Sequence, residues 1–372
     1  MRIAACYDTP IPQMPSMDGW KECSVDTNAH AYRERLMAVG SFSYYPEIVS
    51  DAIYAGERRS SPYGFGELEG SLLTSFVRRG VAERLVEANA RLPARHILMT
   101  LDTFRTEAVQ TALFNPFKEK LLQPPFNRTE AQATEETQQY VSLPSRPNSP
   151  HMTGAAVDLT IVRFDDNKSW TEHQVLTRRA KAMANRGVVP DDKDWPAFHK
   201  IEARRGQLLR EATMLDMGVA FDEVSIDAYG DRTALRYFED KLEKGAAMTE
   251  RDLDALKNRR LLYHTLTAVG FTLYPAEPWH ADLGDKVWSK ITGKPAIYGF
   301  ATLSDTNKAF EAMRRAVYQE EIQKYEAVKA AFKSAGKEIT APSSDPRFSK
   351  QPELCAHRIS PDIRSYIGGG PR

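Results

Sequence analysis

The spacing of apolar residues predicts most of the helices and strands along the chain. Three- and four-residue spacing predicts a helix over residues 66–92, and helical patterns also extend over residues 106–122, 248–270 and 304–337. Short apolar runs predict strands over residues 95–105, 155–162 and 271–280. Because helices alternate with only a few short strands, the pattern favours an α+β fold with a small antiparallel sheet flanked by helices.

The segments between these elements carry different signals. Residues 1–66 show little periodicity and suggest an irregular segment that wraps around the rest. Residues 121–150 are polar and proline-containing, which is typical of a long loop. Residues 165–213 are densely charged at helical spacing, which predicts an inserted, solvent-facing helical pair.

Composition excludes several classes of protein. Fifty basic residues balance fifty acidic ones, so the net charge gives no support for nucleic acid or a membrane surface as partner. The cysteines Cys6, Cys23 and Cys355 lack CxxC spacing, which argues against a disulfide framework and a thiolate zinc site. No signal peptide and no apolar run of membrane-spanning length are found, so we expect a cytoplasmic protein.

The stretch "SPHMTGAAVDLTIV", residues 149–162, places polar residues where a strand begins. Alternation along this strand puts Asp158 on one face with Ala156 and Thr160, opposite Val157, Leu159 and Ile161. A carboxylate buried in a sheet is costly unless a positive group meets it.

A metal ion can supply that positive charge. A catalytic zinc site needs about three nitrogen or oxygen ligands from the protein, and His151, Asp158 and His280 form such a set. Glu277 then stands near the ion as a general base, and Arg105 stabilises negative charge that develops on the substrate. Taken singly, a histidine at the surface, an aspartate paired with arginine and a chance ExxH sequence are each commoner. The occurrence of all of them at strand ends favours the metal site.

These residues resemble the zinc-dependent D-alanyl-D-alanine dipeptidases of the VanX type, which share a fold with the hedgehog signalling domain. The motif SxHxxGxAxD is complete, from Ser149 to Asp158, and ExxH follows at Glu277 to His280. The family's D-x-[YF]-R sequence matches residues 102–105, which end in Arg105, and its MGxxFD sequence matches residues 217–222, which end in Asp222. The resemblance covers residues 41–300 with interruptions.

The resemblance implies one zinc ion per chain, bound by His151, Asp158 and His280, and hydrolysis of D-Ala-D-Ala with Glu277 as base. It also implies that Asp222 binds the substrate ammonium, and we expect Ser149 to orient the substrate carboxylate or the first ligand. The family role is D-alanine recycling from the cell wall or resistance to glycopeptides. Alternatives are a D,D-carboxypeptidase or endopeptidase acting on longer wall peptides and a non-catalytic zinc-binding module.

The chain departs from the family at three places. Pro278 stands where the family often has tryptophan, the helical insert lengthens the gap before Glu277, and a C-terminal extension is added. We therefore expect a catalytic domain over residues 1–303, with an insert at about 165–213, and a helix and tail over 304–372 that pack on it. The insert and tail could cover the cleft or build an interface between subunits of a homo-oligomer.

Overall fold

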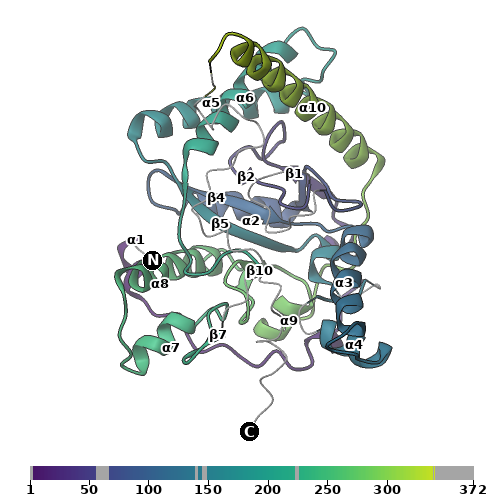
Figure 1. The fold of residues 1–372 in the computed structure, drawn as a ribbon, viewed down its shortest axis with the longest axis vertical. Coiled ribbons are helices and arrows are strands. Elements are labelled where there is room, and N and C mark those ends of the chain that lie inside the picture. The colour runs from purple at the N-terminus through teal and green to yellow at the C-terminus, as the bar shows by residue number, and fades with distance from the viewer. Residues whose placement is uncertain are drawn as a thin grey trace.

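The computed structural model describes residues 3–55, 67–138, 141–144, 149–222, 226–337 and 339. These residues form a mixed fold of helices and small open sheets, as expected from the alternation of helical and strand patterns. Figure 1 shows the sheet at the centre, with helices above and below it.

The central sheet contains six of the described strands. Five of them follow the order β2 (Val49–Ser50), β4 (His96–Asp102), β5 (Ala156–Arg163), β10 (His280–Asp282) and β9 (Thr272–Leu273), while β6 (Thr213–Met214) also pairs with β5. All neighbours run antiparallel except β2 and β4, which are parallel. The predicted antiparallel sheet is therefore confirmed apart from its β2 edge.

Both faces of this sheet are covered by helices, and β5 is buried on both of its sides. Val157, Leu159 and Ile161 pack against α2 (Arg79–Asn89) and α8 (Glu250–Thr267). On the opposite face, Val162 packs with α3 (Glu107–Leu122), α5 (Asn167–Asn185) and α6 (Trp195–Glu211). The predicted alternation is confirmed, and it places Asp158 on the face of α3.

The other described elements complete the fold around this sheet. They are the helices α1 (Ile3–Asp8), α4 (Glu130–Thr137), α7 (Tyr237–Glu243), α9 (Lys286–Thr292) and α10 (Asp305–Ser334), the 3-10 helices η1 (Trp20–Glu22), η2 (His30–Arg33) and η3 (Pro150–Thr153), and the strand pairs β1 (Leu36–Val39) with β3 (Ser75–Arg78) and β7 (Ile226–Asp227) with β8 (Gly230–Asp231).

The predicted helix over residues 66–92 is wrong in its first part. Residues 75–78 form β3, and only Arg79–Asn89 are helical. The apolar spacing is helix-like, but Phe76 and Val77 are fully buried in an antiparallel pair with β1. Pairing with a distant strand overrides the local pattern here.

Two segments expected to be irregular contain regular structure. The loop predicted over 121–150 includes α4, whose first turn is closed by a capping box between Thr129 and Gln132. The wrapping segment before residue 56 includes α1, β1 and β2. The predicted strand over 271–280 is instead β9 and the start of β10, separated by a turn at residues 274–279 that contains Pro275 and Pro278.

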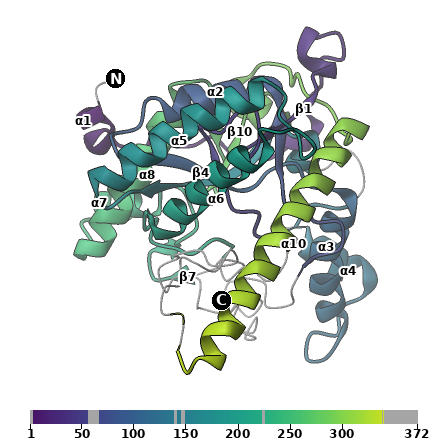
Figure 2. The same cartoon turned by 90° about the horizontal axis from the view of Figure 1, so that it is seen from above.

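The helical pair predicted over 165–213 is confirmed as α5 and α6, but it is not simply solvent-facing. Phe198 and Ile201 of α6 are buried with Phe42 and with Val317 of α10. Figure 2 shows the long α10 lying beside α6. The expected tail after α10 falls almost entirely outside the described residues.

The described part of the chain contains no candidate for a membrane-spanning helix. None of its helices combines the length and the apolar character that a bilayer crossing requires.

Candidate metal centre

His151 sits in η3, immediately before β5. Its Nδ1 donates a hydrogen bond to the carbonyl oxygen of Thr103 at 2.9 Å, so Nε2 is left as an acceptor. Gly154 ends η3 at φ +70°, and a Cβ there would lie 2.3 Å from Leu36 Cδ2. The glycine of the motif is therefore required by close packing and by a left-handed backbone.

Asp158 and His280 face each other across the sheet. They are direct partners in the antiparallel register of β5 and β10. The same row extends to β4, where an irregularity after Thr100 brings Asp102 opposite Asp158. Three polar side chains thus stand side by side on one face of an otherwise apolar sheet.

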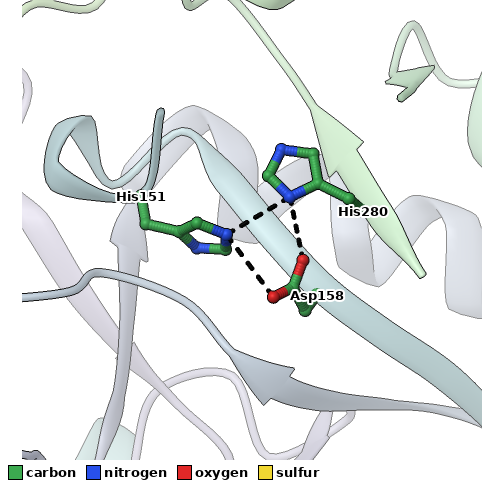
Figure 3. A group of neighbouring side chains, drawn as sticks. All are labelled: His151, Asp158 and His280. Atoms are coloured by element: carbon green, nitrogen blue, oxygen red, sulfur yellow. Dashed lines mark hydrogen bonds and ion pairs between the residues drawn. The ribbon is translucent and has the colours of Figure 1, made fainter. Parts of the chain in front are cut away.

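The three predicted ligands converge on one point (Figure 3). His151 Nε2 lies 3.2 Å from His280 Nδ1 and 3.4 Å from Asp158 Oδ2, and His280 Nδ1 lies 2.9 Å from Asp158 Oδ1. All three residues are buried, at 3–6% exposure. Among the described residues, this is the one group of His, Cys, Asp and Glu side chains whose geometry could hold a metal ion.

The donor set fits a small divalent cation. Ligand atoms about 2.0–2.1 Å from a tetrahedral ion are about 3.3 Å apart, close to the separations seen here. Burial raises the pKa of Asp158, but His151 and His280 lower it more, so its carboxyl is ionised. Two imidazoles and one carboxylate suit zinc and other borderline transition metals, so the residues fit a metal ion without identifying it.

The Glu277 carboxylate lies near the three candidate ligands and belongs to the turn between β9 and β10. Two backbone hydrogen bonds hold this turn: Tyr274 N–H donates to the His280 carbonyl, and Glu277 N–H donates to the Tyr274 carbonyl. The turn brings Glu277 Oε2 to 3.7 Å from His280 Nδ1. Burial, together with the charge of Asp158, raises the pKa of Glu277 despite the opposing effect of His280, which suits a proton acceptor.

Arg105 follows β4 and is held firmly. Its Nε and Nη2 donate to Asp102 Oδ2 at 3.0 and 2.6 Å, and its Nη1 donates to Gln110 Oε1 at 3.0 Å. Burial alone lowers the pKa of Arg105, but Asp102, Tyr54 and Asp158 raise it more. The guanidinium is therefore a fixed positive charge.

All seven residues singled out from the sequence line one cavity. Its volume is about 180 Å³, and its walls include Ser149, His151, Asp158, Asp222, Glu277, His280 and Arg105. That volume is more than ten times the roughly 10–15 Å³ that one water molecule needs, which leaves room for a small ligand. Asp222 adopts a left-handed backbone, with φ +54°, and its Oδ2 lies 3.5 Å from the Tyr54 hydroxyl.

Three further residues belong to this site and were missed from the sequence. Tyr54 lines the cavity and contacts both Arg105 and Asp222. Asp102 binds Arg105 and lies 3.5 Å from His151 Nδ1. Asp282 lies behind His280, with Oδ1 at 3.0 Å from Nε2. Asp102 is the first residue of the D-x-[YF]-R sequence, so the sequence could have identified it as a site residue. Tyr54 and Asp282 lie outside every motif.

Comparison with protein-family models and with curated proteins finds no match to this chain. A functional assignment therefore depends on the sequence motifs and on the geometry of this cavity.

Proposed function

We propose that the protein is a zinc-dependent metallopeptidase that hydrolyses D-Ala-D-Ala or a similar small D,D-dipeptide. The observation that carries this proposal is the convergence of His151, Asp158 and His280 in a cavity that also contains Glu277 and Arg105. A metal-binding module needs the first three residues only. Glu277 as a base and Arg105 as a fixed cation in the same cavity favour catalysis over simple metal binding.

In this proposal, His151 Nε2, His280 Nδ1 and one Asp158 oxygen hold the ion. When bound, a divalent cation acts as a Lewis acid and lowers the pKa of water to about 7. Glu277 accepts the proton of the water that attacks the peptide carbonyl, then delivers it to the departing amine nitrogen. The Arg105 guanidinium stabilises the negative charge that develops on the carbonyl oxygen.

The substrate class follows from the cavity's charges and from the motif resemblance. Asp222 offers a carboxylate in the cavity wall that suits a free ammonium group, and Ser149 is buried beside His151 in the same wall. A free amino terminus next to the scissile bond means a dipeptide. The small, mainly antiparallel sheet flanked by helices is consistent with the hedgehog and D,D-peptidase fold, which we propose for this chain.

The test combines metal analysis with an assay of free D-alanine. The full chain should bind about one zinc ion and release D-alanine from D-Ala-D-Ala, but not hydrolyse L-Ala-L-Ala. Removal of the metal by a chelator should abolish the reaction, and added zinc should restore it. Absence of turnover in the zinc-loaded protein would overturn the proposal.

Longer and N-blocked substrates separate the dipeptidase from a carboxypeptidase or endopeptidase. We expect N-acetyl-D-Ala-D-Ala and a D,D-terminated tripeptide to react far more slowly than the free dipeptide. Asp222→Ala should raise KM for the free dipeptide more than for the blocked one, because only the free dipeptide carries an ammonium group. Equal effects would remove Asp222 from that role.

A further inference from the structure

Asp282 is the buried carboxylate behind His280. The two residues lie two positions apart on β10, so their side chains point to the same side of the strand. Asp282 is fully buried, and its backbone is paired with Ala156 of β5 and Thr272 of β9. Its Oδ1 lies 3.0 Å from His280 Nε2, within hydrogen-bond distance.

This contact decides which imidazole nitrogen can bind a cation. When Nε2 carries the proton and donates it to Asp282, Nδ1 keeps its lone pair and points at Asp158 and His151. The two histidines are supported differently, because His151 Nδ1 donates to the neutral carbonyl of Thr103. Asp282 is at hydrogen-bond distance from His280 Nε2, whereas the carboxylate behind His151, Asp102, stands 3.5 Å from Nδ1.

We propose that Asp282 is a positioning residue of the metal centre, which fixes the tautomer and orientation of His280 and strengthens it as a ligand. The inference rests on the proposed metal site and adds to it a residue outside the sequence motifs. A carboxylate that accepts from a ligating imidazole increases the basicity of that ligand.

Asp285 supports Asp282 from the next turn. Gly284, at φ +83°, turns the chain where a Cβ would lie 2.5 Å from Ile297 Cγ1, and this brings the Asp285 carboxyl into hydrogen-bond contact with Asp282. Asp285 Oδ1 also caps α9 by accepting from Trp288 N at 2.9 Å. The Oδ2 atoms of both aspartates are buried and accept no hydrogen bond from a backbone N–H or from any side-chain donor other than the two carboxyl groups themselves, among the described residues.

A hydrogen bond between two carboxyl groups requires one shared proton. Burial and the charge of Asp282 raise the pKa of Asp285 well above its usual range, so Asp285 is the protonated partner. Asp285 therefore donates to Asp282 and holds its carboxylate in place beside His280.

The experiment measures zinc affinity rather than activity. The full chain is stripped of metal, and its Kd for Zn²⁺ is measured by competition with a chromophoric chelator. We expect Asp282→Ala to weaken zinc binding by about 10–100-fold, the usual effect of losing such a partner. Asp282→Asn should weaken it less, because the amide oxygen still accepts from Nε2 but carries no charge.

A matched control separates positioning from general damage. Asp252 is also a buried aspartate, but it pairs with Lys241 at 2.8 Å and caps α8. Asp252→Asn should lower the melting temperature and leave the zinc Kd within about threefold of the original protein. The absorption spectrum of the Co²⁺-loaded protein should change in Asp282→Ala and remain the same in Asp252→Asn, because only the first alters the ligand field.

The outcomes distinguish this inference from the proposed function. If the unmodified chain binds zinc and both Asp282 variants bind it within threefold of that value, the positioning role is wrong and the metal site stands. If the unmodified chain binds no zinc, both are wrong. If Asp282→Ala does not fold, the Kd and Co²⁺ spectrum of Asp282→Asn decide between these results.

Discussion

Two clusters of buried polar side chains in this protein look alike by burial but differ in charge balance. In the first, His151, Asp158 and His280 meet beside β5 and β10. In the second, Glu202 and Arg205 of α6 lie 2.6 Å apart, at 1–3% exposure. The charged groups of the second cluster find their hydrogen-bond partners within the protein. Arg205 also donates to the Pro46 carbonyl and to Thr177, and Glu202 accepts from Phe42 N.

The contrast shows that burial alone does not mark a functional site. The Glu202–Arg205 pair contains its own cation, so nothing further is needed to neutralise it. In the first cluster, three ligand atoms point at each other, and Arg105, in the same cavity, is engaged by Asp102. Two imidazoles and one carboxylate whose ligand atoms converge on one point, without a lysine or arginine in the group, are what suggests a metal ion.

The largest effect should come from His280→Ala. Removing one of three ligands should reduce bound zinc from about one per chain to near zero, with loss of dipeptide hydrolysis. Zinc content after dialysis measures this directly. The exposed His30 provides a control, and His30→Ala should retain both metal and turnover. Zinc bound at the original stoichiometry by His280→Ala would remove His280 from the ligand set.

Glu277→Ala should separate chemistry from metal binding. Loss of a general base should lower kcat by about 10²–10⁴-fold. Zinc stoichiometry should stay the same, because Glu277 approaches His280 only to 3.7 Å and lies outside the three ligands. Steady-state kinetics and metal analysis on the same sample provide both values. Retained turnover would mean that another group takes the proton.

The three residues of the candidate metal centre could be predicted from the sequence because their signals are local. Asp158 interrupts a β-branched strand, Gly154 marks a tight backbone, and ExxH places Glu277 near His280. The helices α3, α8 and α10 were also predicted, and in the structure each begins after a Thr or Ser whose side chain caps the first turn.

What the sequence did not predict depends on contacts between distant segments. β3 is a strand because β1, almost forty positions earlier, pairs with it. Asp102 faces Asp158 only because the β4–β5 register shifts at that point. Asp282 lies two positions after His280 on a three-residue strand, so both side chains point to the same side and come within hydrogen-bond distance. No sequence motif includes Asp282.

Arg205→Met should break the second cluster without touching the first. Glu202 would be left buried without its ion-pair partner, which typically lowers the free energy of unfolding by about 3–5 kcal/mol. Chemical denaturation measures the loss, and zinc stoichiometry should remain unchanged. Adding Glu202→Gln should recover part of the stability, because no unpaired charge then remains. A decrease in the free energy of unfolding below about 1 kcal/mol would mean that Glu202 does not depend on Arg205 to neutralise its charge.

His173 gives the smallest predicted effect and tests the apolar surroundings of the second cluster. It is fully buried beside Phe164 and Trp170, no described group hydrogen-bonds its ring nitrogens, and burial, with a smaller effect of Arg205, lowers its pKa to about 3.

The unfolded chain takes up a proton at His173 near pH 6.5 and the folded chain does not, so stability is lost as the pH falls from about 6.5 towards 3. At pH 5 this amounts to about 2 kcal/mol. His173→Phe should therefore lose about 2 kcal/mol less than the original protein between pH 8 and pH 5 in denaturant unfolding. His30→Phe, at an exposed position, should show the original pH dependence. The same pH dependence in His173→Phe as in the original protein would show that the ring is solvated or paired in solution.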